Sequence, residues 1–237
     1  MRRRILNELV ASRRQKRPLA LVTNIESGAQ SLVFTDDVLH ESDRRENELN
    51  DEAVATVRLF LKEQRSVTTE IAGSRFIIRI YAPPPRLMVV GAVHIAQALL
   101  PMAGLAGFQV HLIDPREAFS ADSRFPGLDL IREWPDRALD ELSPDSSTAI
   151  VTLSHDPKID DPALQTALAS EAFYIGALGS RKTHAARLQR LSALGVDAET
   201  LTRIHAPVGL HLGGRAPAEI AVSILAQIIE TRCKPGT

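Results

Sequence analysis

The stretch LMVVGAVHIAQALLPMAGLAGFQVHLID, residues 87–114, decides the fold class of this chain. Four apolar residues at 87–90 end at Gly91, apolar residues at helical spacing follow over 95–105, and a second apolar run covers 109–113. This order predicts a strand, a tight turn, a helix and a second strand. Helices cover both faces of a parallel sheet, so its strands are apolar along their whole length, and the stretch is typical of a βαβ unit.

The same stretch has the length of a membrane span, because residues 87–113 hold no Asp, Glu, Lys or Arg. We reject that interpretation because histidines and glutamines are spread along the segment. Residues that break helices also interrupt it: Gly91, Pro101, Gly104 and Gly107. The sequence therefore predicts a buried part of a sheet and no membrane partner.

Downstream of this unit, apolar runs and helical patterns continue to alternate. We expect strands at 148–153, 173–175 and 204–206, and helices at 136–142, 162–169, 182–194 and 217–231. Such alternation predicts an α/β fold with a Rossmann-like, doubly wound and mainly parallel sheet. Right-handed crossovers then place helices on both faces of the sheet.

Three consecutive prolines, residues 83–85, mark a boundary, because they favour an extended segment and end any preceding element. Before them we expect a short amphipathic helix near the start, strands at 19–24, 31–35, 66–71 and 75–81, and a helix at 48–64. The chain is therefore divided into a small α+β N-terminal domain (residues 1–82), a proline-rich linker (residues 83–86) and the Rossmann-like domain (residues 87–237).

Composition excludes several classes of protein. The 237 residues are 44% hydrophobic and 24% charged, as in ordinary globular domains. With 28 basic and 29 acidic side chains, the formal charge is −1, so the chain as a whole is not built for nucleic acid or an anionic membrane. The one cysteine, Cys233, cannot form an internal disulfide, and no group of residues has metal-ligand spacing. We expect a cytoplasmic protein with no metal site of its own.

Ligands of a doubly wound sheet bind beyond the carboxyl ends of its strands, where the strand order reverses. The first turn on that edge runs from Gly91 to Ala96 and contains His94. Gly91 and Ala96 fit a dinucleotide fingerprint, but Val93 stands where its second glycine would approach a pyrophosphate. Nucleotide binding and a nucleotide site that has been lost or reused both remain open for this turn.

The next strand ends at Asp114, twenty-three residues after Gly91. A carboxylate at that place can accept hydrogen bonds from a ribose diol, and Arg116 beside it can contact a phosphate.

The second turn is Ser154-His155-Asp156-Pro157. A histidine at a strand end is well placed for acid–base chemistry or for holding a polar ligand. The alternative is that His155 and Asp156 only start the next turn, since Asp before Pro favours turn initiation.

The third turn runs from Gly176 to His184 and holds Gly179, Ser180, Arg181 and Lys182. Ser180 can cap the following helix, whose free N–H groups attract an anion. Basic residues at a helix start oppose the helix dipole, and a bound anion would compensate for that conflict. This turn is our first choice for a phosphate site.

The fourth turn is a glycine-rich loop, residues 206–216, which leads into a helix with Pro217 and Glu219 in its first turn. A tight loop with a favourable helix start explains these residues, and Arg215 and Glu219 are the candidates for function. Two anion-binding helix starts on one edge suggest a ligand with more than one phosphate, or a long phosphorylated ligand.

These turns resemble those of the XdhC/CoxI family, accessory proteins of molybdenum hydroxylases. The resemblance covers about residues 84–231 and is carried by six runs: GAVHIA at 91–96, DPR at 114–116, SHDP at 154–157, YIGALGSR at 174–181, IHAPVGL at 204–210 and RAPAEIA at 215–221. It implies a cytoplasmic protein that binds molybdenum cofactor and helps it receive its terminal sulfur ligand. Such a protein delivers the cofactor to a xanthine dehydrogenase-type or carbon monoxide dehydrogenase-type enzyme, with a sulfur-donating cysteine desulfurase as a second partner. The cofactor is molybdopterin, which carries one phosphate, or its dinucleotide form, which carries a diphosphate.

Two departures from the family pattern matter. Val93 replaces a glycine that is usual in the family, which weakens the case for NAD(P). Residues 1–82 contain no cysteine, whereas the family's N-terminal domain usually has a glycine-rich, cysteine-containing segment. A separate protein that supplies this half is therefore an expected partner. The residues that we assign to cofactor binding are Gly91, His94, Asp114, Arg116, His155, Asp156, Gly176, Gly179, Ser180, Arg181, Arg215 and Glu219.

The leading hypothesis is therefore a molybdenum cofactor chaperone without catalytic residues or turnover of its own. Gly91 and Asp114 support an alternative, an NAD(P)-dependent oxidoreductase. A third hypothesis is a nucleotide-responsive regulatory or scaffold module that docks a partner through the acidic stretch 36–52. Apolar helix faces are compatible with a homodimer.

Overall fold

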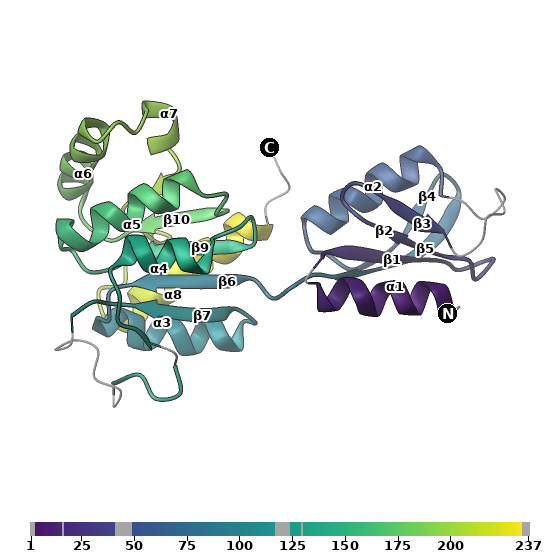
Figure 1. Ribbon diagram of the computed structural model, residues 1–237, viewed down its shortest axis with the longest axis horizontal. Helices are drawn as coiled ribbons and strands as arrows, with labels where there is room; N and C mark the ends of the chain where they lie inside the picture. Colours follow the sequence, from purple (N-terminus) through teal and green to yellow (C-terminus); the bar gives the residue numbers. More distant parts are fainter. Residues whose placement is uncertain (1–2, 16, 41–48, 117–123, 129, 234–237) are drawn as a thin grey trace. The chain divides into compact units, whose positions relative to one another are not determined.

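The computed structural model describes residues 3–15, 17–40, 49–116, 124–128 and 130–233 (Figure 1). The chain forms two compact units, with the division between Pro83 and Pro84.

The unit after Pro84 is built on a six-stranded sheet in which every paired strand is parallel. Its strand order is β11-β10-β9-β6-β7-β8. The strands are β6 (Arg86–Val90), β7 (Gln109–Ile113), β8 (Leu130–Ile131), β9 (Thr148–Thr152), β10 (Tyr174–Ala177) and β11 (Ile204–His205). The predicted Rossmann-like fold class is confirmed, and β8, a two-residue edge strand, is the strand of this sheet that the sequence did not predict.

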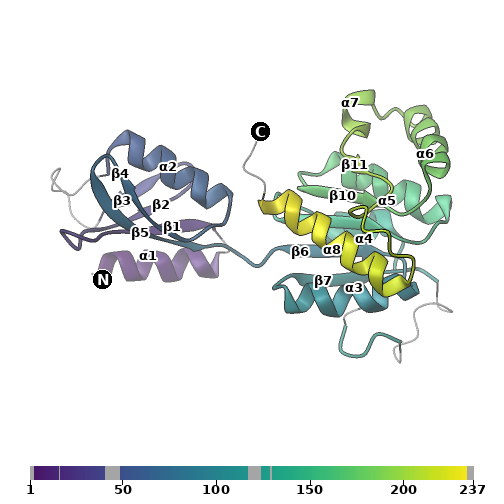
Figure 2. The same cartoon turned by 180° about the vertical axis from the view of Figure 1, so that it is seen from behind.

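Helices cover both faces of this sheet (Figures 1 and 2). They are α3 (His94–Leu105), α4 (Pro135–Leu142), α5 (Pro157–Ala169), α6 (Arg181–Ala193), α7 (Ala198–Leu201) and α8 (Pro217–Cys233). Side chains alternate along β6, so Leu87 and Val89 pack into the core under α3 and α8. Met88 and Val90 pack into the core under α4 and α5 on the other face. This two-sided burial is why residues 87–90 carry no polar side chain.

Helix α5 corrects the sequence prediction, which began this helix at Pro162. The Asp156 side chain accepts a hydrogen bond from the Lys158 N–H, and Pro157 follows it in the first helical position. An aspartate cap followed by proline is a strong helix start, and it outweighs the interruption at Pro162, which lies inside the helix.

The unit before Pro84 is an antiparallel sheet of order β3-β2-β1-β5-β4 with one helix on each face. Its elements are α1 (Arg3–Arg14), β1 (Leu19–Asn24), β2 (Gln30–Val33), β3 (Val38–His40), α2 (Asp51–Lys62), β4 (Val67–Ile71) and β5 (Ser74–Tyr81). Helix α2 begins later than predicted because the Asn50 side chain caps it by accepting from the Ala53 N–H. Residues 41–48 of the acidic stretch considered for docking lie outside the described residues. No helix within the described ranges is both long and apolar enough to cross a bilayer.

Candidate functional site

The topology brings the predicted turns to one edge of the six-stranded sheet. From β6 the chain moves outward to β7 and β8, then returns to the other side of β6 with β9, β10 and β11. The strand order therefore reverses between β6 and β9. Ligands of open α/β sheets bind beyond the carboxyl ends of the strands near such a point.

At the reversal itself, the β6–α3 turn packs directly against the β9–α5 turn. Gly91 has φ +111°, and a Cβ atom on it would lie 2.9 Å from the Ser154 backbone nitrogen. Only glycine fits this close approach. Val93 precedes α3 without a side-chain cap and packs against the core, while His94 begins the helix with an exposed side chain. Gly91 thus has a packing role that is independent of any nucleotide.

Asp114, at the end of β7, is fully buried and has four hydrogen bonds. Its carboxylate accepts from the Ala92 N–H at 2.7 Å, and from the backbone N–H, Nε and Nη2 of Arg116 at 2.8–2.9 Å. Burial alone would raise the pKa of Asp114, but these hydrogen bonds outweigh it and lower the pKa below its usual value. Both oxygens are therefore engaged inside the protein, and the expected contact with a ribose stays a prediction.

The β9–α5 turn places His155 and Asp156 differently. Asp156 caps α5, as one of the two interpretations of the sequence proposed. His155 has an exposed side chain on a backbone in the left-handed region, at φ 61°. Left-handed backbone is uncommon for a residue other than glycine.

A cavity of about 560 Å³ opens beside β10 and β11, within the size range of small-molecule sites. The loop 207–215 forms most of its wall, and α8 and the β10–α6 turn complete it. It brings together three predicted site residues from two separate turns: Arg181, Arg215 and Glu219. Its lining does not include the other predicted residues, which are Gly91, His94, Asp114, Arg116, His155, Asp156, Gly176, Gly179 and Ser180.

The start of α6 forms one side of this cavity. Ser180 caps the helix by accepting from the Thr183 N–H at 3.1 Å. The backbone N–H groups of Arg181 and Lys182 have no partner among the residues that the structure describes, and both side chains are exposed. Gly179 turns the chain into the helix at φ +142°. Free amides and two cations at a helix start form a favourable place for an anion.

Gly176 has a packing role in the structure, and its predicted contact with cofactor stays a prediction. A Cβ atom there would lie 2.6 Å from the Val208 side chain and 2.8 Å from the Tyr174 ring. Glycine is therefore required so that the loop 207–215 can pack on β10, and Gly176 shapes the wall of the cavity from behind.

The start of α8 forms the opposite side of the cavity, and here the protein supplies its own anion. The Glu219 carboxylate accepts from the Arg215 N–H at 2.8 Å and from the Ala216 N–H at 3.0 Å through the same oxygen. These two backbone hydrogen bonds lower the pKa of Glu219. Glu219 thus forms a capping box with the residue that precedes α8, and the predicted anion contact at this helix start stays a prediction.

Gln227 on α8 holds the cavity loop in place, and sequence reasoning missed it. Its Oε1 atom accepts from the Tyr174 hydroxyl at 2.6 Å and from the Gly209 N–H at 2.8 Å. Burial raises the pKa of Tyr174, whose ring stacks on His205 with 4.7 Å between centroids. An amide on an amphipathic helix is ordinary in a sequence, so no signal marked it.

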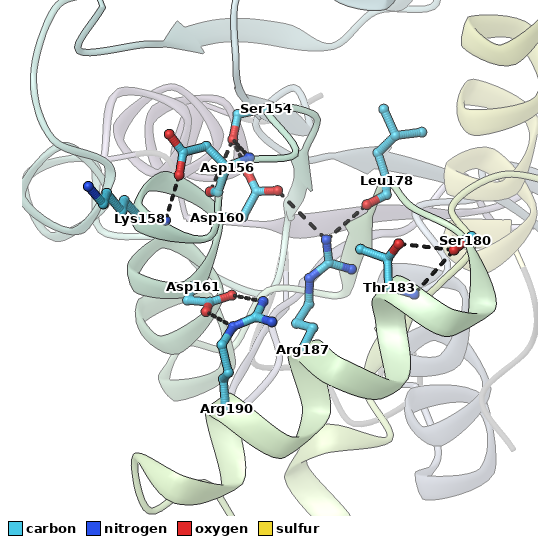
Figure 3. A network of polar contacts seen from close by, with 10 residues as sticks. All are labelled: Ser154, Asp156, Lys158, Asp160, Asp161, Leu178, Ser180, Thr183, Arg187 and Arg190. Carbon is cyan, nitrogen blue, oxygen red and sulfur yellow. Dashed lines mark hydrogen bonds and ion pairs between the residues drawn. The ribbon is translucent and has the colours of Figure 1, made fainter.

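Sequence reasoning also missed a buried ionic network under the β10–α6 turn (Figure 3). Arg187, 2% exposed, donates to the Leu178 carbonyl at 2.9 Å and lies 3.7 Å from Asp160, which accepts from the Ser154 hydroxyl. Burial raises the pKa of Asp160 and lowers that of Arg187, which still remains charged. The one available signal was that Arg187 lies four residues before Leu191, on the buried face of α6.

The described residues contain no group of three or more His, Cys, Asp or Glu side chains that could hold a metal ion. Among the described residues, the cavity at this edge is lined by the side chains of Arg181, Arg215 and Glu219 together with backbone of the loop 207–215. This combination can bind and orient a small anionic ligand.

The sequence of this chain is similar to a known protein family and to several of its members. The family model described as the XdhC Rossmann domain matches residues 87–228. The molybdenum cofactor insertion chaperone PaoD of Escherichia coli is 35% identical over 152 residues, which are 64% of this chain and 42% of PaoD. A Bacillus subtilis protein described as a probable xanthine dehydrogenase subunit is 35% identical over 179 residues, which are 71% of this chain and 51% of that protein. The matched segment thus spans about half of each relative.

A solved structure supports the fold. A crystal structure described as a xanthine dehydrogenase from Bacillus halodurans superposes with a TM-score of 0.67 at 22% identity. The match covers 97% of this chain and 64% of that one.

Proposed function

Because the chain belongs to the XdhC family, we propose that it binds molybdenum cofactor through its phosphate and delivers it to a xanthine dehydrogenase-type molybdoenzyme. The names of two relatives, an insertion chaperone of molybdenum cofactor and a probable xanthine dehydrogenase subunit, support this role. In this role the cofactor is cargo, and the chain assists its sulfuration and insertion.

The observation that carries the proposal is the cavity between α6 and α8. It has the size of a small-molecule site, and Arg181 and Arg215 line it. The free amides at the start of α6 and the Arg181 guanidinium fit the phosphate of a molybdopterin. The pterin would lie along the apolar part of the wall, which includes Leu178, Val208 and Ile220.

The molybdenum end of the cofactor has no matching metal ligand among the described residues that line this cavity. No cysteine or methionine is among the described residues that line it, and Cys233 lies at the far end of α8. Thiolates are preferred ligands of soft metal ions. We therefore place the molybdenum and its sulfur outside this chain's side chains, with a separate cysteine-containing protein and a cysteine desulfurase as partners.

The NAD(P) alternative has weaker support. Asp114 has both oxygens engaged by Arg116 and Ala92, and Gly91 packs against Ser154. A dinucleotide site needs the carboxylate for the ribose and space at the glycine turn.

The test is co-elution of purified chain and molybdenum cofactor on a sizing column at micromolar protein. Wild-type protein should retain the cofactor, and Arg181→Ala should bind it about tenfold more weakly because a charge-assisted hydrogen bond is lost. Arg137→Ala is the matched control, since it removes an exposed arginine of α4 that does not line the cavity. Failure of the wild-type protein to retain cofactor would refute the proposal.

A further inference from the structure

The sheet of the N-terminal unit is covered unevenly on the face that carries α1. Leu19 and Leu21 of β1 pack under this helix. Their cross-strand partners on β5, Tyr81 and Arg79, lie on the same face, as does Ile77 two residues before Arg79. The strands β5 and β4 present exposed side chains at alternate positions on this face, whereas their opposite face packs into the core under α2. The α1 face thus has a covered half over β1 and β2 and an uncovered half over β5 and β4.

Helix α1 forms a wall along the uncovered half. Leu9 of α1 packs into the core, and Leu6 and Val10 lie to one side of it, within about 100° around the helix. Arg13 lies on that same side, and its guanidinium is 5.8 Å from the centroid of the Tyr81 ring at the end of β5. Leu6 and Val10 are therefore turned toward the uncovered strands, and they are 41% and 40% exposed.

Exposed apolar side chains of the helix and of the strand meet along this wall. Helix α1 and strand β5 run in the same direction (Figure 1). From the contact of Arg13 with Tyr81, seven residues back along the helix and four residues back along the strand both span roughly 10–13 Å. Leu6 is therefore level with Ile77, which is 48% exposed. Single exposed apolar residues are normal, but a group at one corner indicates a contact surface.

Two guanidinium groups lie at the same corner without a counter-ion. Arg79 lies over the same tyrosine ring as Arg13, at 5.9 Å from its centroid. Within the described ranges, neither arginine has a hydrogen bond or an ion pair. The nearby acids stand at Arg75 instead, because Glu26 pairs with it at 3.1 Å and Glu70 is its cross-strand neighbour. Like charges that share one ring repel each other, and a carboxylate from a partner would relieve this repulsion.

The shape of this corner fits one helix. Its floor is two strands wide, about 10 Å, which is close to the diameter of an α-helix. Its wall, α1, rises above the floor by a similar distance, so a flat bilayer that rests on α1 cannot reach Ile77 on the strand below.

We infer that this corner docks an amphipathic α-helix of a partner protein, with an apolar face and Asp or Glu along its edge. The occupant would lie beside α1 and complete the helical layer on this face, as helices do in hydrophobic grooves. Complementary charge would fix its orientation. The inference goes beyond the proposed function, because it involves neither the cavity nor the cofactor. We call this surface the α1–β5 shelf, and its residues are Leu6, Val10, Arg13, Ile77, Arg79 and Tyr81.

The experiment selects displayed random peptides of about 16 residues, roughly four helical turns, on the immobilised full-length chain. The enriched peptides should carry apolar residues at helical spacing with Asp or Glu beside them. Arg79→Ala and Ile77→Gln should each weaken binding of the strongest peptide about tenfold, measured by fluorescence anisotropy. Arg65→Ala is the matched control and should leave the affinity unchanged. Arg65 also lies over an aromatic ring of this unit, but that ring belongs to Phe60 of α2, on the opposite face of the sheet.

The inference is overturned if no peptide is enriched, or if the enriched peptides bind Arg79→Ala and Ile77→Gln as tightly as wild type. A second measurement uses wild-type protein alone, in case the variants do not fold. Changing the acidic residues of the strongest peptide to Asn and Gln should weaken it about tenfold, and an unchanged affinity would contradict the charge complementarity. Vesicles of phosphatidylserine and phosphatidylcholine should not bind. Binding of these vesicles that Arg79→Ala abolishes would assign the shelf to an anionic membrane and refute the inference.

Discussion

The Nη2 atom of Arg187 lies 3.7 Å from the Oδ2 atom of Asp160, and both side chains are 2% exposed. This pair joins α6 to α5 inside the protein. Through the Leu178 carbonyl and the Ser154 hydroxyl it also joins two of the turns at the ligand edge (Figure 3). The position of the cavity wall therefore depends on charges that lie beneath it.

Arg187→Met should destabilise the protein by about 3–5 kcal/mol, because it leaves the Asp160 carboxylate buried without its cation. The Leu178 carbonyl would also lose its donor. The free energy of unfolding in urea measures this effect. Arg187→Met combined with Asp160→Asn should cost less than the sum of the two single changes, since no uncompensated charge remains.

Arg190→Met is the matched control on the same helix. Arg190 pairs with Asp161, but its side chain is 38% exposed, so the loss should be at most about 1 kcal/mol. Equal losses for Arg187→Met and Arg190→Met would show that burial does not distinguish the two pairs.

Gly91→Ala should destabilise the protein more than Gly107→Ala. Both glycines have positive φ, so each substitution costs about 1–2 kcal/mol of backbone strain. At Gly91 the new methyl would also lie 2.9 Å from the Ser154 backbone nitrogen, whereas nothing lies within 4 Å of a Cβ at Gly107. The difference between the thermal unfolding midpoints of the two variants measures the clash. Equal midpoints would disprove the close packing of the β6–α3 turn against the β9–α5 turn.

The fold class could be predicted from residues 87–114 because strand periodicity and the absence of charge are local properties. The predicted start of α5 was wrong, because the prediction gave Pro162 more weight than the Asp156 cap. Two edge strands, β8 and β3, were not predicted, because two or three residues are too few to show a periodicity. The equally short β11 was found only because it continues the alternation of strands and helices, so local patterns predict long buried elements more reliably than short ones.

The candidate site was only partly predictable. The turns with Arg181, Arg215 and Glu219 were found because strand ends are visible in the sequence, and the structure brings these residues to one cavity. The hydrogen-bond partner of each polar side chain, in contrast, depends on which groups the fold brings close to it. Glu219 binds amides four and three residues before it, and Gln227 binds Gly209 and Tyr174 on other elements.

Gln227→Leu should weaken cofactor binding about tenfold, because the Gly209 amide and the Tyr174 hydroxyl both lose their acceptor and the cavity loop loses its anchor. It should also lower the free energy of unfolding by about 1–3 kcal/mol. Tyr174→Phe is the control, since it removes one hydrogen bond but leaves Gly209 anchored. It should cost about 1 kcal/mol and leave affinity nearly unchanged. Titration and urea unfolding separate the two effects, and equal losses of affinity would contradict the anchoring role.

The Asp114 carboxyl should make the protein less stable in acid. Its pKa in the folded protein is lowered, because hydrogen bonds from Arg116 and Ala92 outweigh the effect of burial. The unfolded chain therefore binds more protons as the pH falls below about 4, where a free Asp titrates. The stabilisation is complete above that pH, and it is lost as the pH falls through the folded-state pKa.

Asp114→Asn should accordingly lower the free energy of unfolding by about 2–3 kcal/mol at pH 7. This gap in unfolding free energy between variant and wild type should shrink as the pH falls from 5 to 3. Urea unfolding at a series of pH values measures the gap. Asp197→Asn is the control, because the carboxylate of Asp197 caps the short helix α7 at an exposed position. Exposed charges contribute little to stability, so the free energies of unfolding of Asp197→Asn and wild type should differ only slightly at every pH. A gap for Asp114→Asn that stays constant from pH 7 to pH 3 would mean that the buried carboxylate does not titrate with folding, and that its four hydrogen bonds stabilise the turn equally well without the charge.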